Sequence, residues 1–200
     1  MILALSIVAI AVIIVCSLDM IFAAPVFEIS PWFFVAAVLL SVVYVVAVDG
    51  LFAFITKMFP EKWVSIDKKF FDVSKGEQRF YEKLGVKKWK DKYLELGGIG
   101  GFSKKKLVDP ENPEYVKLFL IESNKGLLDH LCGIVFGFTV VLIFPIKYAL
   151  VVGLPVAIVN AFMNYMSVMI LRYNTPKLKV LYKRALRNAE RKQQEEIEKQ

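Results

Sequence analysis

Cysteine and histidine are both scarce in this chain. Its 200 residues include two cysteines, Cys16 and Cys132, and one histidine, His130. Two thiols and one imidazole cannot form a closed zinc shell, and they provide no disulfide framework. The chain also lacks a P-loop, a dinucleotide-binding glycine fingerprint, a serine nucleophile elbow and an HExxH zinc motif. These absences exclude the commonest metal, nucleotide and serine-hydrolase sites, and we expect neither a metal nor a resident cofactor.

Charged residues are nearly absent from four long apolar blocks, which cover residues 2–24, 32–55, 131–144 and 148–171. About 20 apolar residues cross a bilayer, so the first, second and fourth blocks qualify by length. The third is about as short as a re-entrant or buried helix, and it crosses only if it extends back through Leu127. The first block has no basic n-region and is too long for the apolar part of a signal peptide, which predicts a retained helix.

These blocks predict an all-α, polytopic membrane protein with about four transmembrane helices in two hairpins and with cytoplasmic amphipathic helices. Pro145 ends the third block, and the short link that follows makes the third and fourth blocks a helical hairpin. Four regions are expected: a transmembrane hairpin over residues 1–57, a cytoplasmic or interfacial amphipathic region over 58–126, a second membrane hairpin over 127–171, and a cytoplasmic basic helical tail over 172–200.

Basic residues lie almost wholly on one side of this topology. Residues 57–125 contain 16 Lys and Arg against 11 Asp and Glu, and residues 172–200 contain 9 against 4. The positive-inside rule places both regions in the cytoplasm, and four crossings place the N-terminus there too. We therefore expect a multi-pass protein of the cell membrane with both termini cytoplasmic. The net charge of +7 favours anionic lipids and phosphate-bearing substrates over nucleic acid.

The cytoplasmic region has apolar residues at helical spacing beside lysines. This pattern predicts interfacial amphipathic helices over residues 63–73 and 77–86. Asn112 followed by Pro113 is a fair cap and first-turn pair for a later helix.

A cluster of lysines surrounds Trp89 and includes Lys90 and Lys92. One interpretation is an aromatic anchor at the headgroup level with snorkelling lysines beside it. The other is a basic clamp for phosphate groups, such as those of coenzyme A. The sequence leaves both interpretations open.

His130 stands between a charged stretch and the third apolar block. An ionisable group at the membrane edge is costly to retain, and histidine is the usual general base near neutral pH. The alternative is an interfacial imidazole that only bonds a carbonyl or a headgroup. Glu122 could orient His130 if a helix ends before Gly126 and a new one begins, because glycine favours the position after a helix end. Asp129 is the competing partner.

The fourth block ends at Arg172, which is either a positive-inside anchor or part of a site. Asn174 or Thr175 with Pro176 has the pattern of an N-cap and a first-turn proline. This pattern predicts that a separate, charged helix begins here. Capping is then the simplest role of Asn174.

Several short motifs follow one another in a fixed order over residues 80–187. They are Phe80-Tyr81 leading into Lys88-Trp89-Lys90 and Lys92, Glu122 eight residues ahead of His130, and Arg172-Tyr173-Asn174 with Pro176 and Leu178. The ordered set resembles the bacterial membrane acyltransferases typified by glycosyl-4,4′-diaponeurosporenoate acyltransferase, a family of carotenoid biosynthesis. The chain departs from that enzyme in a glycine-rich stretch, residues 97–101, and in a longer N-terminal pair of apolar helices.

The resemblance implies an enzyme that moves a fatty acyl group from acyl-CoA or an acyl-carrier thioester to a hydroxyl of a lipid-linked, glycosylated acceptor. His130 would be the general base and Glu122 its orienting partner. Trp89, Lys90 and Lys92 would bind the phosphates of the donor. Lys125, Asn174 or a backbone amide near Gly126 would stabilise the oxyanion. Arg172 would lie near the same boundary between water and membrane.

A non-catalytic protein is the alternative, either a membrane adaptor or the protomer of an oligomeric transporter. Asp19 and Asp49 are acids inside apolar blocks that could line an ion or substrate path. In an enzyme the same two acids could contact sugar hydroxyls or join the first two helices. A transporter should concentrate its ionisable residues at mid-membrane, whereas most of these motifs lie near the cytoplasmic edge.

Overall fold

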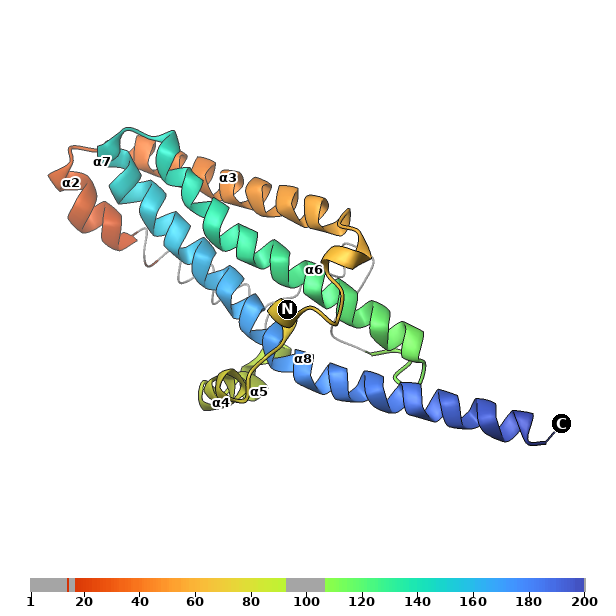
Figure 1. The fold of residues 1–200 in the computed structure, drawn as a ribbon. Helices are drawn as coiled ribbons and strands as arrows, with labels where there is room; N and C mark the ends of the chain where they lie inside the picture. Colours follow the sequence, from red (N-terminus) through yellow and green to blue (C-terminus); the bar gives the residue numbers. More distant parts are fainter. Residues whose placement is uncertain (1–13, 15–16, 93–106, 200) are drawn as a thin grey trace. The chain divides into compact units, whose positions relative to one another are not determined.

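The described part of the chain is helical (Figure 1). The computed structural model describes residue 14 and residues 17–92 and 107–199. No strand occurs within these ranges, and three helical stretches there are long and apolar enough to cross a membrane. The predicted all-α membrane fold is therefore confirmed. Most of the first apolar block, Cys16 and residues 97–101 lie outside the described residues.

In the described part of the chain, three long helices are separated by series of shorter helical elements. In chain order the elements are η1 (Asp19–Ala23), α2 (Ala24–Val26), α3 (Pro31–Lys57), η2 (Glu61–Trp63), η3 (Lys69–Phe71), α4 (Lys75–Lys83), α5 (Val86–Trp89), η4 (Lys90–Lys92), α6 (Pro113–Gly137), η6 (Phe138–Ile143), α7 (Ile146–Tyr148), η7 (Ala149–Gly153) and α8 (Leu154–Ile197). η1 and η7 are π-helical, and the other η elements are 3₁₀ turns.

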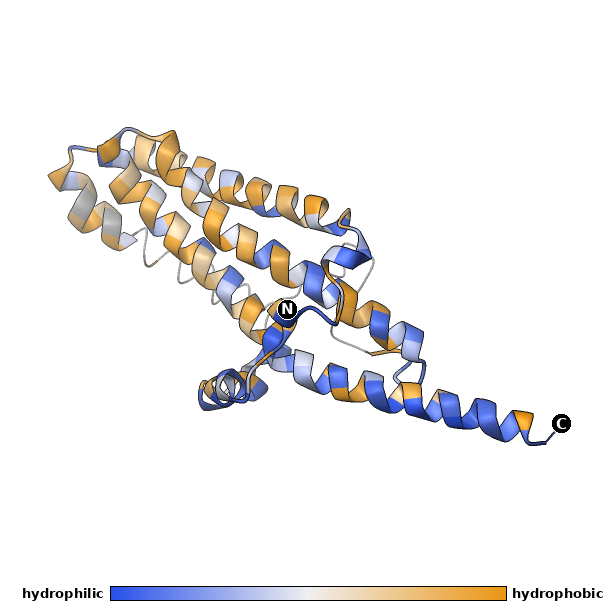
Figure 2. Cartoon of the chain, viewed as in Figure 1, coloured by the Kyte–Doolittle hydropathy of each residue, from blue (hydrophilic) through white to orange (hydrophobic). Residues whose placement is uncertain are grey.

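The second, third and fourth apolar blocks fall in the three candidate spans, Pro31–Lys57, Pro113–Ile143 and Ile146–Ile197. The third block lies in a helical stretch that is long enough to cross a membrane. This stretch consists of α6, which begins well ahead of the block, and η6, and together they have 31 residues. Helical structure stops at Ile143 and resumes at Ile146, which confirms the turn predicted at Pro145. The far end of α8 is mostly hydrophilic, unlike α3 (Figure 2).

Two helices begin at capping residues. Asn112 Oδ1 accepts hydrogen bonds from the amides of Glu114 and Tyr115, at 3.0 and 3.3 Å, and α6 starts at Pro113. The predicted cap and first-turn pair is thus confirmed. Ser74 caps α4 in the same way, accepting from the amide of Glu77.

Two predicted helix boundaries are wrong. α6 runs unbroken through Gly126, and α8 runs unbroken through Pro176. Glycine costs only about 1 kcal/mol inside a helix, and the neighbouring Leu127 is buried, so packing outweighs the local preference. Proline removes one amide donor, and the neighbouring Tyr173 and Thr175 are buried, so packing again outweighs the local preference. Because Asn174 and Pro176 lie inside α8, neither caps a new helix.

The amphipathic helix predicted over residues 63–73 is also wrong, because this stretch forms two 3₁₀ turns, η2 and η3, joined by a loop. Side chains from α6 and α8 donate hydrogen bonds to backbone carbonyls that an α-helix over this stretch would use for its own hydrogen bonds. Asn124 Nδ2 donates to the Val64 carbonyl at 2.8 Å, and Lys179 Nζ donates to that of Ile66 at 2.7 Å. Tertiary hydrogen bonds therefore replace the local ladder.

The chain divides into two compact units, each built from two segments. The first comprises Met1–Thr56 and Leu128–Val168, as far as these are described, and the second comprises Lys57–Leu127 and Met169–Gln200. In the first unit, α3 packs against η6 and α8 through a cluster formed by Val45, Val140, Val156 and Ala157. The second unit buries the apolar side chains Val64, Phe71, Tyr81, Val86, Val116, Leu120 and Tyr173.

Candidate functional site

A network of polar side chains joins three helices of the first unit. His130 Nδ1 lies 2.8 Å from Asn164 Oδ1. Asn164 Nδ2 donates to Asp49 Oδ2 at 3.1 Å, and Asn160 Nδ2 lies 3.5 Å from Asp49 Oδ1. Asp49 belongs to α3, His130 to α6 and the two asparagines to α8. The network therefore brings the single histidine of the chain together with an intramembrane acid.

The hydrogen bonds of Asn164 determine how its amide is oriented. Its Nδ2 atom faces three acceptors, namely Asp49 Oδ2, the Asn160 carbonyl at 3.2 Å and Asn160 Oδ1 at 3.4 Å. Only the amide nitrogen can donate to these oxygens, so Oδ1 is the atom that faces His130. Nδ1 of the imidazole must then carry the hydrogen. In the neutral ring the basic lone pair is on Nε2.

Gly133 allows the three helices to approach at this point. A Cβ atom on Gly133 would lie 2.7 Å from Asp49 Oδ1 and 2.9 Å from Asn164 Cγ and Nδ2. Its carbonyl also accepts from Asn160 Nδ2 at 3.3 Å. Gly137, one turn later, faces Asn160 closely enough that a Cβ would clash with its Nδ2. Small residues at a helix interface let polar side chains of the neighbouring helices bond across it.

The polarity of this network is unusual for its surroundings. Asn164 is 6% exposed and lies in the apolar part of the candidate span Ile146–Ile197. Polar groups within a membrane are costly unless they are paired, and ionisable ones there usually mark function. Asp49 was recognised in the sequence, but its neighbours Asn160 and Asn164 were missed. Their spacing of four residues, which places them on one helix face, was the signal that could have found them.

The pairing of Glu122 with His130 that was expected from a helix break at Gly126 is not present. The two residues lie eight positions apart on one unbroken helix, which separates them by about 12 Å along its axis. Glu122 instead forms an ion pair with Lys125, with Nζ 2.9 Å from Oε1. Lys125 also donates to the Lys57 carbonyl at 3.3 Å. His130 takes Asn164 as its partner in place of Glu122.

The lysine cluster around Trp89 occupies two short turns of the second unit, α5 and η4. Gly85 precedes them with a φ of 66°, a left-handed conformation that favours glycine. The indole Nε1 of Trp89 donates back across this turn to the Leu84 carbonyl at 3.2 Å. Lys90 pairs with the neighbouring Asp91 at 3.0 Å, and Lys92 is exposed. Trp89, Lys90 and Lys92 therefore lie on adjacent short turns, an arrangement that fits either a clamp or an anchor.

Arg172 uses all three of its guanidinium nitrogens for contacts within the second unit. Nε and Nη2 bond the two carboxylate oxygens of Glu77, and the Nη2 contact measures 2.8 Å. Nη2 also donates to the Asp72 carbonyl at 2.9 Å, and Nη1 donates to that of Phe70 at 3.3 Å. A bidentate pair of this kind is among the stronger charged contacts. Arg172 thus fixes α4 and η3 to α8, and the following Asn174 is partly buried.

This ion pair should make the second unit less stable in acid. Hydrogen bonds from the Arg172 guanidinium hold the pKa of the Glu77 carboxyl below its ordinary value. The stabilisation of the folded state by the Glu77–Arg172 pair is therefore complete above the unfolded-state pKa of about 4.3. It is lost as pH falls through the lowered folded-state pKa. We expect Glu77→Gln to destabilise the protein by about 1–2 kcal/mol at pH 7 and by much less near pH 3.

Thermal unfolding of the detergent-solubilised protein across this pH range measures the difference. Glu82→Gln is the matched control, because Glu82 is an exposed residue of the same helix. An equal Tm loss at pH 7 and at pH 3 for Glu77→Gln would contradict the assigned role of the carboxylate charge.

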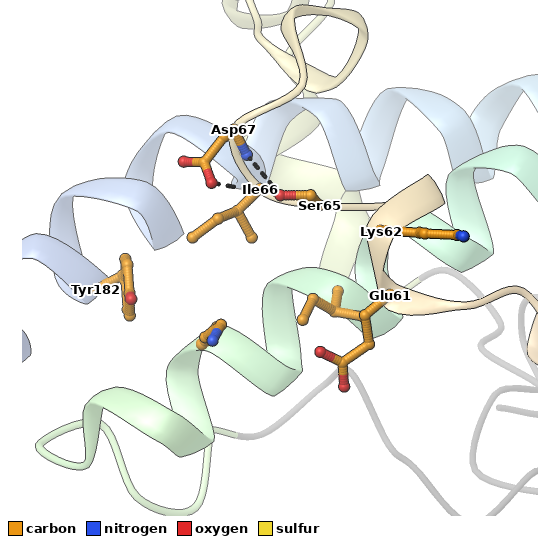
Figure 3. A pocket seen from close by; sticks show the side chains of 8 residues that line it. Glu61, Lys62, Ser65, Ile66, Asp67 and Tyr182 are labelled. Carbon is orange, nitrogen blue, oxygen red and sulfur yellow. Dashed lines mark hydrogen bonds between the residues drawn. The ribbon is translucent and has the colours of Figure 1, made fainter.

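A polar pocket of about 380 Å³ lies in the second unit between η2, the loop after it, α6 and α8 (Figure 3). It is lined by Glu61, Lys62, Ser65, Ile66, Asp67, Lys117, Ile121 and Tyr182. Its two cationic and two acidic side chains balance, so it offers no net attraction for a phosphate. Among the described residues, no group of three or more His, Cys, Asp or Glu side chains could hold a metal ion.

The geometry can be compared with known proteins. The sequence model of the glycosyl-4,4′-diaponeurosporenoate acyltransferase family matches residues 67–184, which is more than half of the chain. The matched region contains His130, Asn160 and Asn164, whereas Asp49 lies ahead of it. Comparisons with curated proteins and with solved structures find no match. The chain therefore belongs to the glycosyl-4,4′-diaponeurosporenoate acyltransferase family and is a membrane acyltransferase that takes an acyl donor and a glycolipid acceptor.

Proposed function

We propose that the protein transfers a fatty acyl group from a thioester donor to a hydroxyl of a lipid-linked, glycosylated acceptor, with His130 as the general base. The hydrogen bond between His130 Nδ1 and Asn164 Oδ1 is the observation that carries this proposal. It leaves the basic lone pair on Nε2, the form of the ring that a general base requires. Family membership supports the acyl-transfer chemistry and counts against the adaptor and transporter alternatives.

The proposed reaction is a direct transfer. Nε2 of His130 accepts the proton of the acceptor hydroxyl as its oxygen attacks the thioester carbonyl. The new C–O bond forms, the C–S bond breaks, and the imidazolium returns the proton to the departing thiolate. The products are an ester and a free thiol, and no covalent acyl-enzyme is needed. Cys132 lies two residues past His130 on α6, so helical geometry directs it elsewhere.

The oxyanion that forms during attack needs hydrogen-bond donors. Lys125 and Asn174 are the side chains that the family resemblance implies for this role, and both stay predictions. The backbone amide near Gly126 is no longer a candidate, because inside an unbroken α-helix it bonds to the carbonyl four residues earlier. We assign Glu122 to positioning Lys125, on the strength of their ion pair. Arg172 is assigned to holding the second unit together, because Glu77 and two carbonyls occupy its guanidinium.

We further propose that Trp89, Lys90 and Lys92 bind the phosphates of the donor, which is acyl-CoA or an acyl-carrier thioester. Their place on two adjacent short turns and the excess of lysines in the surrounding cluster support this assignment. A cytoplasmic location of this region and of both termini, as the charge distribution predicts, would place the clamp where such donors occur.

The test of the overall function is turnover by the purified, full-length protein in lipid nanodiscs. Long-chain acyl-CoA and a glycolipid with free sugar hydroxyls are supplied, and ester formation is followed by mass spectrometry together with release of free thiol. We expect the two products in equal amounts. Thiol release without ester would show hydrolysis instead of transfer. Absence of both products across a panel of chain lengths and acceptors would overturn the proposal.

The donor clamp leads to a kinetic prediction. Lys90→Ala combined with Lys92→Ala should raise the KM for acyl-CoA about tenfold and leave kcat nearly unchanged, because phosphate contacts bind ground and transition states alike. An acyl thioester without phosphates, such as an acyl-N-acetylcysteamine, should show no KM difference between the variant and the wild type. Lys83→Ala is the matched control, since Lys83 is an exposed lysine at the end of α4. A fall in kcat with unchanged KM would contradict the clamp.

A further inference from the structure

We propose that Asp49 and Asn164 form a carboxylate–amide relay that positions His130 and stabilises its protonated form. The proposal deepens the assignment of His130 as the base and rests on it. It rests also on the unbroken hydrogen-bonded path from the imidazole, through one amide, to the carboxylate. In this relay Asn164 and Asp49 are positioning residues, because they act on the reaction through His130.

The first role of the relay is to fix the tautomer. An isolated neutral imidazole carries its hydrogen on either nitrogen. Asn164 cannot rotate its amide without turning Oδ1 toward Asp49 Oδ2 and the Asn160 oxygens, which would place acceptors against acceptors. Its Oδ1 therefore remains directed at Nδ1. Nε2 is thus held unprotonated before the acceptor hydroxyl arrives.

The second role is electrostatic. When Nε2 takes the proton, the ring becomes a cation inside an apolar helical unit, where an unpaired charge is costly. The Asn164 carbonyl dipole faces this charge directly, and the Asp49 carboxylate lies behind the same amide. Each hydrogen bond of such a chain polarises the next. The negative end of the relay therefore stabilises the imidazolium that forms as the proton is transferred.

The ionisable groups that α3, α6 and α8 contribute to the described part of the first unit are few. Tyr44 and Asp49 are on α3, and Asp129 and Cys132 are the near neighbours of His130 on α6 itself. The part of α8 in this unit, residues 154–168, contributes Tyr165, whose side chain is exposed. Of these groups, only Asp49 has a described hydrogen-bonded path to His130 through Asn164. A variant at Asp49 thus tests the relay at its charged end.

The test compares pH profiles of kcat/KM for acyl transfer by the full-length protein. Asp49→Asn keeps the size of the side chain and removes its charge, so we expect the acidic limb to move to lower pH and kcat to fall about tenfold. Asn164→Ala removes the oxygen that accepts the hydrogen bond from Nδ1 of His130. It should shift the limb in the same direction and lower kcat by about 10–10²-fold, as the loss of an orienting partner typically does.

Tyr44→Phe is the matched control. It removes a different interhelical hydrogen bond of the same unit, that of Tyr44 Oη with Thr139 Oγ1 at 3.0 Å, without contacting the relay. A structural defect alone would lower the Tm of all three variants and leave their pH profiles at the wild-type position. That result would overturn the relay.

A charge swap keeps the proposal testable if the single variants fold poorly. The double variant Asp49→Asn with Asn164→Asp retains one carboxylate and moves it directly against Nδ1. We expect it to recover at least tenfold in kcat over Asn164→Ala, with the acidic limb displaced above the wild-type position. No recovery and no displacement would overturn the relay. If His130→Ala remains active, the base assignment itself fails. If His130→Ala is inactive while Asp49→Asn and Asn164→Ala match the wild type, only the relay fails.

Discussion

His130→Ala is expected to lower kcat for acyl transfer by about 10²–10⁴-fold, which is the usual contribution of a general base. The ring supplies the only imidazole in the chain. Alanine keeps the helical backbone of α6, and α6 begins at a cap far from this position. The loss should therefore appear in turnover, while the yield of membrane-inserted protein and its elution on size exclusion remain those of the wild type. His130→Gln should be equally inactive, because an amide cannot accept the proton.

Cys132→Ser is the control for this experiment. The thiol lies two residues after His130 on the same helix, and its replacement by a hydroxyl should leave kcat within about twofold. An inactive Cys132→Ser enzyme, or labelling of Cys132 by a donor acyl group, would point to a thioester intermediate. Full activity of His130→Ala would remove the proposed mechanism, whatever the result for Cys132.

The membrane architecture could be predicted from the sequence because it depends on local composition. Apolar blocks of sufficient length and the proline at position 145 gave the described spans and the turn between the last two. The cap at Asn112 was equally local, since the side chain bonds amides two and three residues later. Such features need no knowledge of what the segment packs against.

The helix breaks that were expected at Gly126 and before Pro176 had the same local basis, and both are wrong. A glycine or a proline inside a helix costs about 1–3 kcal/mol, and the free energy of tertiary packing along a long helix can exceed this cost. The 3₁₀ turns in place of a helix over residues 63–73 show the opposite case. There, side chains from α6 and α8 donate hydrogen bonds to the carbonyls of Val64 and Ile66. The sequence of residues 63–73 alone cannot predict these contacts.

The candidate site was predictable only in part. His130 and Asp49 stand out in the sequence because ionisable residues are rare in apolar blocks. Their connection was not predictable, because it passes through Asn164, which lies 34 positions from His130 and 115 from Asp49. It therefore depends on how three helices are aligned with one another. Glu122 was the nearer candidate in sequence, yet a continuous helix holds it two turns away from His130.

Gly133→Ala should reduce activity by about 10²-fold even though it adds a single methyl group. The new Cβ would lie 2.7 Å from Asp49 Oδ1 and 2.9 Å from Asn164, distances that real Cβ contacts essentially never show. Neither side chain can yield easily, because each is held by further hydrogen bonds, and Asn164 would carry His130 with it. A displacement of about 1 Å at catalytic groups can cost 10²-fold in rate.

The matched control for Gly133→Ala is Gly50→Ala. Gly50 follows Asp49 on α3, and a Cβ there would meet no atom within 4 Å. Alanine is the better helix former by about 1 kcal/mol, so this variant should retain full kcat and gain slightly in Tm. Steady-state turnover and thermal unfolding of both variants in nanodiscs compare the two sites directly. Wild-type kcat for Gly133→Ala would show that α3, α6 and α8 do not need the close approach seen at Asp49, and the network would then lose its link to catalysis.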